Sequence, residues 1–185
     1  YDTIKAISSL LLKRRDLPVV LDPVMVSTSG RRLTDDKALR ALPLFLLPLS
    51  RVATPNLHEA STLLGARIRT VDEMKQAARA LYGRHQCAFL IKGGHMEGEE
   101  MVDVLYDGDF HFFTSPRIDT PNLHGTGCTL SSAIATFIGR GCELPEAIAQ
   151  AKEYLNRALQ AGSQLRIGHG NGPLWHMADQ FPVEA

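Results

Sequence analysis

The sequence predicts an α/β domain with a mostly parallel sheet flanked by helices. Short apolar runs of strand length alternate along the chain with longer segments whose apolar residues recur at helical spacing. One β-hairpin signature interrupts this alternation, where two alternating runs flank Asp107-Gly108 in MVDVLYDGDFHFFTS. Strands that are separated by helices pair in parallel, so the hairpin is expected at or near one edge of the sheet.

From the N-terminus, two helices are expected around the first strand. Apolar residues at helical spacing predict a helix over residues 2–14. The run PVVLD, at 18–22, is expected to form a buried strand. A second helix is predicted from about Asp35, and Pro43 should stop or kink it because a prolyl nitrogen cannot donate to the preceding turn.

The next segment repeats the order of strand and helix. RVATPN is expected to be a strand that leads into a helix closed by Gly65. Thr70 and Glu73 have the spacing of a capping box, and the helix that they begin should end near Gly83. CAFLIKGG, which begins at Cys87, is the third expected buried strand.

Two helices are expected after the hairpin. The first has one apolar face, which consists of Leu130, Ala133, Ile134, Phe137 and Ile138. Gly139 and Gly141 are its expected stops, Pro145 fits the first turn of the last helix, and Gly162 should cap that helix.

Composition excludes several classes of partner. With 185 residues, 44% of them hydrophobic and 22% charged, the chain suits one globular domain. The formal net charge is zero and no basic run occurs, which argues against nucleic acid or an acidic membrane surface as a partner. The apolar run LPLFLLPL is too short to cross a membrane. Three widely spaced cysteines suit a reducing cytosol.

Polar residues follow each expected buried strand, in LDPV, ATPN and LIKGG. The carboxyl ends of parallel strands lie on one rim of a sheet, where open α/β folds bind ligands. The segment NLHGTGCTLSSAIATFIGR adds a glycine turn that opens a helix, and the N–H groups and dipole of such a helix start favour an anion. Four segments are therefore expected to face one phosphate-binding cleft.

The residues of the glycine turn allow more than one interpretation. Gly125-Thr126-Gly127 is an ordinary tight turn or a phosphate-binding turn. Cys128 is a small buried residue, or a thiol that the helix start activates as a base or as a close contact to the reacting hydroxyl. A cysteine nucleophile acting with His124 is a third arrangement, although residues four apart across a glycine turn need not meet.

The acidic and basic candidates are equally open to two interpretations. Asn56 and Glu59 form a helix cap, or Glu59 holds a water-bound Mg²⁺ beside a triphosphate. Asp22 is a polar strand end or a second carboxylate near the metal. Lys92 is a solvated residue or a cation directed at phosphate oxygens, and its place before two glycines favours the second. The absence of GxxxxGK[ST] from the sequence argues against a P-loop kinase.

Five motifs occur in one order: LDPVMVSTSG, TPNLHEA, IKGGH, HGTGCTLSSAIA and GHGNGPLWH. Together they resemble the hydroxymethylpyrimidine/phosphomethylpyrimidine kinases of thiamine biosynthesis, members of the ribokinase-like superfamily. The resemblance covers nearly the whole chain and implies a three-layer ribokinase-like fold, with residues 1–185 belonging to a single domain. It also implies phosphorylation of 4-amino-5-hydroxymethyl-2-methylpyrimidine by ATP, followed by phosphorylation of the monophosphate to the diphosphate.

The resemblance implies three groups of site residues. The anion hole and the catalytic position are Gly125, Thr126, Gly127 and Cys128. The residues expected to contact ATP are Thr54, Asn56 and Lys92. The residues expected near Mg²⁺ are Asp22 and Glu59. Cys128 stands where most relatives in the superfamily have an aspartate base.

The resemblance also sets expectations for the whole protein. The chain opens at Tyr1 and lacks the segment G-x-D-x-S-G-G-A-G of the family, so we expect it to be part of a larger protein. That segment would supply much of the pyrimidine pocket, and we expect the present chain alone to be unstable or inactive. The family implies a cytoplasmic homodimer that binds a small pyrimidine.

Three other functions compete with this one. A pyridoxal kinase shares the fold and the Asp-Pro-Val-Met loop, but usually has aspartate at position 128. A hydroxyethylthiazole kinase shares the Gly-Thr-Gly-Cys turn but fits the other motifs less well. A non-catalytic ligand-binding module is the alternative from another class, and turnover of ATP distinguishes it from a kinase.

Overall fold

The structure is a computed structural model that describes residues 1–26, 33–94 and 100–180. Residues 27–30 of the first motif and His95 of the third lie outside the described residues. The chain divides into two compact units, Tyr1–Thr114 and Ser115–Ala185. That residues 1–185 form a single domain stays a prediction.

Within the described residues, five strands form one sheet in the order β1-β2-β3-β4-β5. They are β1 (Val20–Leu21), β2 (Val52–Ala53), β3 (Ala88–Ile91), β4 (Glu100–Tyr106) and β5 (Phe110–Pro116). The first three pair in parallel, with Val20 opposite Val52 and Val52 opposite Ala88, whereas β4 runs antiparallel to β3. The α/β class and the hairpin at one edge are thus confirmed, and the sheet is mixed.

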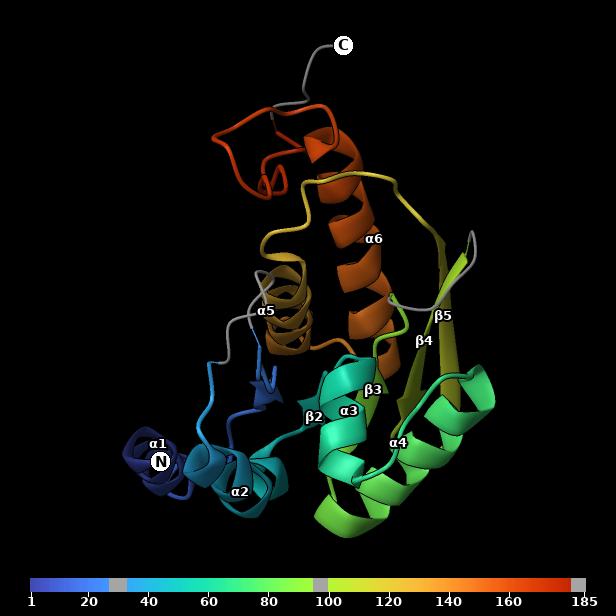
Figure 1. Cartoon of the computed structure of the whole chain (residues 1–185). Coiled ribbons are helices and arrows are strands. Elements are labelled where there is room, and N and C mark those ends of the chain that lie inside the picture. Colours follow the sequence, from blue (N-terminus) through green and yellow to red (C-terminus); the bar gives the residue numbers. More distant parts are fainter. Residues whose placement is uncertain (27–32, 95–99, 181–185) are drawn as a thin grey trace. The chain divides into compact units, whose positions relative to one another are not determined.

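Among the described residues of the first unit, four helices and a short 3₁₀ turn precede or connect these strands (Figure 1). They are α1 (Asp2–Leu11), α2 (Asp36–Phe45), η1 (Leu47–Leu49), α3 (Leu57–Leu64) and α4 (Val71–His85). Both predicted N-terminal signals of α3 and α4 form complete capping boxes, at Asn56 with Glu59 and at Thr70 with Glu73. Gly65 closes α3 in the left-handed conformation, as expected.

Three helices end a few residues away from the positions that the sequence signals suggest. The first helix stops at Leu11 because the chain then tightens, with the Lys13 N–H donating to the Leu10 carbonyl at 3.1 Å. Pro43 lies inside α2 without ending it, since it removes a single N–H close to the helix end. The helix α4 continues past Gly83 to His85, and Gln86 takes the left-handed conformation that ends it.

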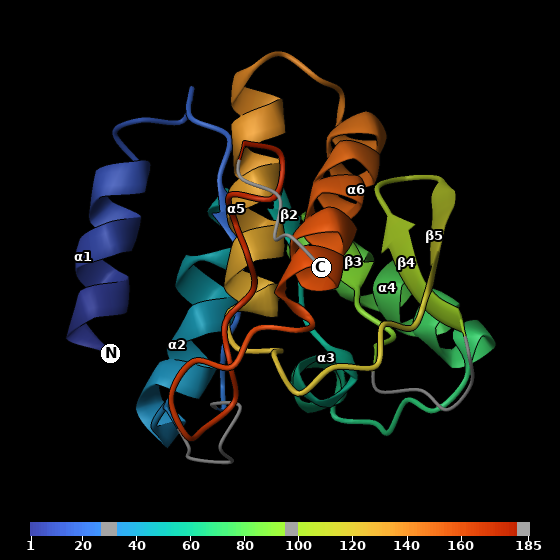
Figure 2. The same cartoon turned by 90° about the horizontal axis from the view of Figure 1, so that it is seen from above.

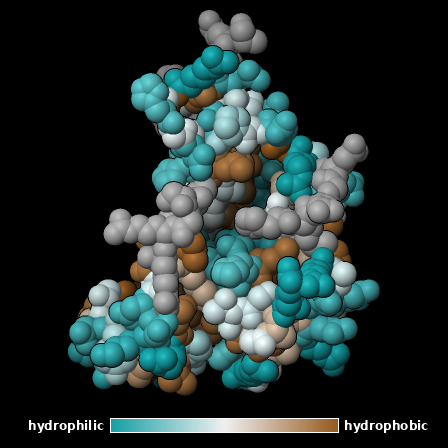
Figure 3. All heavy atoms as spheres, in the orientation of Figure 1, coloured by the Kyte–Doolittle hydropathy of each residue, from teal (hydrophilic) through white to brown (hydrophobic). Residues whose placement is uncertain are grey.

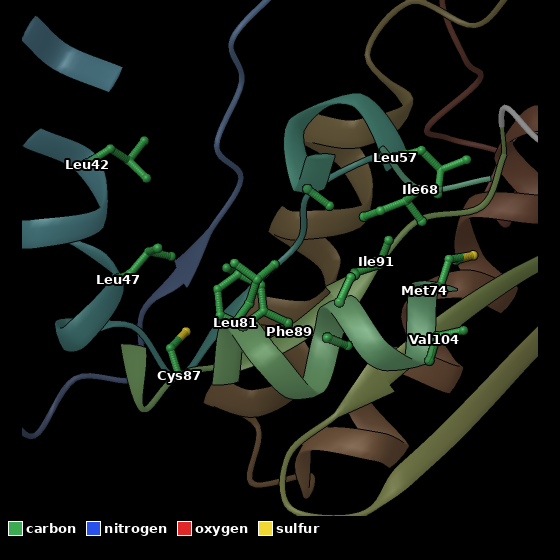
Figure 4. Packing of buried hydrophobic residues seen from close by; sticks show 14 residues of the cluster. Leu42, Leu47, Leu57, Ile68, Met74, Leu81, Cys87, Phe89, Ile91 and Val104 are labelled. Atoms are coloured by element: carbon green, nitrogen blue, oxygen red, sulfur yellow. The ribbon is translucent and has the colours of Figure 1, made fainter. Parts of the chain in front are cut away.

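The core of the first unit lies between α4 and the sheet (Figure 4). Met74, Ala77, Ala78 and Leu81 recur at helical spacing along α4 and are buried. All four residues of β3 are buried as well, which explains why this strand is apolar without alternation. The opposite side of α4 exposes Asp72, Gln76, Arg79 and Arg84, and hydrophilic residues lie among paler ones over this region in Figure 3. The helix is therefore amphipathic and fixes one face of the central strand.

The second unit is built on α5 (Thr126–Gly139) and α6 (Leu144–Gly162), which pack side by side (Figures 1 and 2). Gly139 ends α5 and Pro145 lies in the first turn of α6, as expected. Gly162 does not cap α6, because Ser163 is the cap residue and is right-handed. A Cβ on Gly162 would instead lie 2.9 Å from the Trp175 nitrogen, so close packing requires glycine there.

No helix among the described residues is long and apolar enough to span a membrane.

Candidate functional site

In the first unit, three polar residues from the ends of neighbouring strands meet. Asp22 follows β1 directly, Thr54 follows β2 and Lys92 follows β3. Lys92 Nζ lies 3.0 Å from Asp22 Oδ1, and Thr54 Oγ1 donates to the same oxygen at 3.2 Å. Three of the four segments expected to face one cleft therefore come together at one rim of the sheet.

The backbone around Lys92 is held from both sides. Its N–H donates to the Pro55 carbonyl at 2.9 Å, so it continues the parallel pairing with the β2 side. On the β4 side, the Gly93 N–H donates to Asp103 Oδ1 at 2.8 Å, and a Cβ on Gly93 would clash with the Val102 carbonyl. The side chain of Lys92 therefore starts from a fixed point.

Asn56 and Glu59 cap α3 and also belong to the rim. The Glu59 N–H donates to Asn56 Oδ1 at 2.9 Å, and the Asn56 N–H donates to Glu59 Oε2 at 2.8 Å. Glu59 is only 4% exposed although it is ionisable, and both Asp22 and Lys92 act on it electrostatically. The capping interpretation and the site interpretation of this residue are thus compatible.

Burial raises the pKa of the Glu59 carboxyl above its ordinary value, and the negative charge of Asp22 adds to this effect. The N–H groups of Asn56 and Met25 and the ammonium of Lys92 oppose the rise. Desolvation is the largest of these influences. Glu59 is therefore a carboxylate whose charge the fold accommodates poorly and which a cation would stabilise.

The donor set of this rim fits one kind of metal. In the part of the chain that the structure describes, no three His, Cys, Asp or Glu residues are grouped so as to hold an ion. A closed site of four protein ligands, such as structural zinc needs, does not fit. Two neighbouring carboxylates, Asp22 and Glu59, do fit Mg²⁺, which commonly keeps several waters and takes its other ligands from phosphates.

In the second unit, the start of α5 has the backbone that an anion site needs. Gly125 takes a left-handed conformation, with φ of 89°, as N-cap, and no side chain caps the helix there. The Thr126 hydroxyl donates to the Leu123 carbonyl at 2.8 Å and closes the turn. The N–H groups of Gly127 and Cys128 belong to the first helical turn, which lacks acceptors within the helix.

Cys128 is exposed, so the interpretation as a small buried residue was wrong. The reason is local, because the residues that follow it, Thr129 and Leu130, carry the buried face of α5. Among the described residues, no hydrogen bond joins Cys128 to His124, whose N–H donates to the Gly172 carbonyl at 3.1 Å. A thiol–imidazole pair at this turn thus has no support.

A buried amide joins the turn to the rest of the second unit. Asn122 Nδ2 donates to the carbonyls of Gly162 and Leu165, each at 2.7 Å, and a Cβ on Gly172 would clash with Asn122 Oδ1. His176 Nε2 lies 2.8 Å from Thr129 Oγ1. These contacts bring the motif GHGNGPLWH to the glycine turn.

Sequence reasoning missed Asp103, Asn122, Thr129 and His176 as residues that support the site. Asp103 alternates normally with apolar neighbours in β4, and Asn122 resembles an ordinary turn residue. Thr129 and His176 carried a signal, since each lies in one of the five motifs.

The sequence profile of the phosphomethylpyrimidine kinase family matches residues 1–175. The chain belongs to this family. It is 45% identical to the hydroxymethylpyrimidine/phosphomethylpyrimidine kinase of Rhizobium meliloti, in an alignment that covers 95% of the chain and 66% of that protein. It is also 45% identical to the thiamine biosynthesis bifunctional protein ThiED of Geobacter sulfurreducens, of which it covers 36%. The chain thus spans less than two thirds of either relative.

Solved structures of similar fold include pyridoxal kinases and phosphomethylpyrimidine kinases. A pyridoxal kinase of Bacillus subtilis in an ADP complex superimposes with a TM-score of 0.85 at 35% identity, over 97% of the chain and 66% of that structure. A phosphomethylpyrimidine kinase from Clostridium difficile gives 0.74 at 35% identity, over 85% of the chain and 64% of that structure. The predicted ribokinase-like fold of the family is confirmed.

The raised pKa of Glu59 predicts how stability depends on pH. Below the ordinary pKa of 4.5, Glu59 is protonated in both the folded and the unfolded protein, so its burial costs no stability from charge. As the pH rises through the raised pKa of the folded state, the carboxyl ionises in a place that disfavours its charge, and the folded protein loses stability. Glu59→Gln has no group that titrates at this position. The free energy of unfolding of this variant, relative to that of the wild type, should therefore increase as the pH rises from about 4 to about 7. Urea unfolding of the intact protein without Mg²⁺ or nucleotide measures this difference.

Glu73→Gln is the matched control, because Glu73 has the same capping-box role at the start of α4. Glu73 is only partly buried, so this variant measures the loss of a capping-box carboxylate without the burial of Glu59. A difference between Glu59→Gln and the wild type that stays constant with pH would contradict the desolvation of Glu59.

Proposed function

We propose that this chain forms the ATP-binding and phosphoryl-transfer part of a kinase of thiamine biosynthesis. The kinase phosphorylates 4-amino-5-hydroxymethyl-2-methylpyrimidine and then converts the monophosphate to the diphosphate. The observation that carries the proposal is the cluster of Asp22, Thr54 and Lys92 beside the buried Glu59. The names of the relatives in the same family support the choice of substrate.

In this proposal the first unit binds the nucleotide and its metal. Lys92 contacts phosphate oxygens, and Thr54 and Asn56 keep the rim in shape through Asp22 and Glu59. Asp22 and Glu59 hold Mg²⁺, whose charge offsets the negative charge that phosphoryl transfer spreads over the oxygens. The poor solvation of Glu59 favours this assignment, because a cation relieves it.

The second unit supplies the anion hole at Gly125, Thr126 and Gly127. Backbone N–H groups at a helix start stabilise developing negative charge without reorganising. Cys128 is exposed at this turn, where it can approach the acceptor hydroxyl. A loose transition state needs little help from a base, so a thiol suffices where most of the superfamily has a carboxylate.

We further propose that the protein acts in the cytoplasm as a homodimer, as the family resemblance implies. The three cysteines, Cys87, Cys128 and Cys142, are all unpaired, which suits a reducing compartment.

Phosphorylation of pyridoxal is the second candidate function. It is favoured by the similarity of the chain to the pyridoxal kinases of Bacillus subtilis and Staphylococcus aureus, at 35% and 28% identity. The higher identity to pyrimidine kinases, 45% over 177 residues, favours the first candidate.

ATP consumption by the intact protein, with the pyrimidine and pyridoxal offered separately, tests the proposal. We expect faster turnover with the pyrimidine, continuing to the diphosphate. A preference for pyridoxal would assign the enzyme to vitamin B6 salvage, and no turnover with either substrate would indicate a non-catalytic module.

Cys128→Ala should lower kcat by about ten- to a hundredfold while leaving the fold intact, because the exposed thiol packs against no core. Steady-state kinetics and circular dichroism of the intact protein measure the two effects. Cys142→Ala is the control, since Cys142 is an unpaired, half-buried thiol outside the proposed site. Near-wild-type turnover in Cys128→Ala would remove this residue from the mechanism.

A further inference from the structure

The ion pair of Asp22 and Lys92 joins two residues that the proposed function assigns to different ligands. Lys92 is assigned to a nucleotide phosphate and Asp22 to Mg²⁺, yet their charged atoms lie 3.0 Å apart. Each ligand therefore competes with the partner residue: the phosphate competes with Asp22 for the ammonium, and the metal competes with Lys92 for the carboxylate.

The side chains of this ion pair are largely buried, so separating their charges costs considerable free energy. The side chains of Lys92 and Asp22 are 17% and 12% exposed, whereas those of the surface pair Arg14 and Asp16 are 60% and 66% exposed. Removing one partner from a sheltered pair leaves an uncompensated charge, which costs far more than at the surface.

The local structure allows Lys92 to change partners without moving its backbone. Its N–H is bonded to Pro55 and the next N–H to Asp103, while its four-carbon side chain is flexible. Thr54 bonds to Asp22 Oδ1 and would keep that carboxylate in place when the ammonium leaves.

Glu59 makes the departure of Lys92 costly unless another cation arrives. The carboxyl is buried, the charge of Asp22 disfavours its ionised form and the charge of Lys92 favours it. If Lys92 turned to a phosphate alone, two neighbouring carboxylates would face each other without a cation. A divalent cation at these carboxylates removes that cost.

We propose that the Asp22–Lys92 ion pair makes tight binding of the nucleotide phosphates conditional on Mg²⁺, because the metal replaces the ammonium at Asp22 and thereby releases Lys92 to the phosphate. This inference rests on the proposed function of the site. It makes the ion pair a device that discriminates metal-bound from metal-free nucleotide.

Calorimetric titration of the intact protein with ADP, once in EDTA and once in excess Mg²⁺, tests this inference without turnover. The wild type should bind ADP weakly in EDTA and more tightly with Mg²⁺. Asp22→Asn keeps the acceptor for Thr54 but releases Lys92, so its metal-free affinity for ADP should rise about tenfold, as expected for one recovered charge-assisted hydrogen bond. The gain in affinity that Mg²⁺ gives should shrink in this variant.

The same titration in the Lys92→Met background separates release of Lys92 from mere loss of a negative charge. If release is the cause, Asp22→Asn should give no gain in metal-free affinity when combined with Lys92→Met. A gain that persists in the double variant, or no gain in Asp22→Asn alone, would overturn the inference.

Asp16→Asn is the control for an ordinary loss of negative charge, and both ADP affinities should stay at the wild-type values. If the wild type binds no ADP even with Mg²⁺, the proposed function and the inference fail together. If it binds ADP with Mg²⁺ but Asp22→Asn shows no metal-free gain, only the inference fails.

Discussion

The parallel pairing of β1, β2 and β3 is the constraint on which the candidate site depends. In this register Leu21 lies opposite Ala53, and Ala53 lies opposite Phe89, so the residues just beyond each strand emerge at one rim. A slip of one residue in any of these short strands would turn Asp22, Thr54 or Lys92 to the other face. The burial of β3 under α4 is what prevents such a slip. Packing of the core thus fixes the position of the charged groups.

The same rim concentrates charge where the fold solvates it poorly. Two carboxylates and one ammonium lie together, and one of the carboxylates, Glu59, is almost completely buried. Burial of a charged group of this kind lowers stability, and a bound cation would offset that cost. The capping box with Asn56 explains how the helix tolerates it, because Glu59 also satisfies a backbone N–H at the start of α3. One side chain therefore serves both the fold and the site.

The features that could be predicted from the sequence are those that depend on residues close together in the chain. Capping boxes at Asn56 and Thr70, and polar residues after apolar runs, depend on neighbours in the chain, and the structure contains all of them. The cap at Gly162 was mispredicted because a glycine suggests a cap, whereas Ser163 takes that place. The helix α4 ends close to Gly83, as expected, but Gln86 is the residue that caps it. Asp103 and Asn122 escaped notice because their partners, Gly93 and Gly162, lie 10 and 40 residues away in sequence. The roles of Gly125, Thr126, Gly127 and Cys128 remain proposals that rest on the resemblance and on an exposed helix start.

The most direct test of the account is a crystal structure of the intact protein with Mg²⁺ and ADP. The account predicts the metal at Asp22 and Glu59, and a phosphate oxygen within hydrogen-bonding distance of Lys92 Nζ. Nucleotide bound elsewhere, or Lys92 still paired with Asp22 beside a bound Mg²⁺, would contradict it.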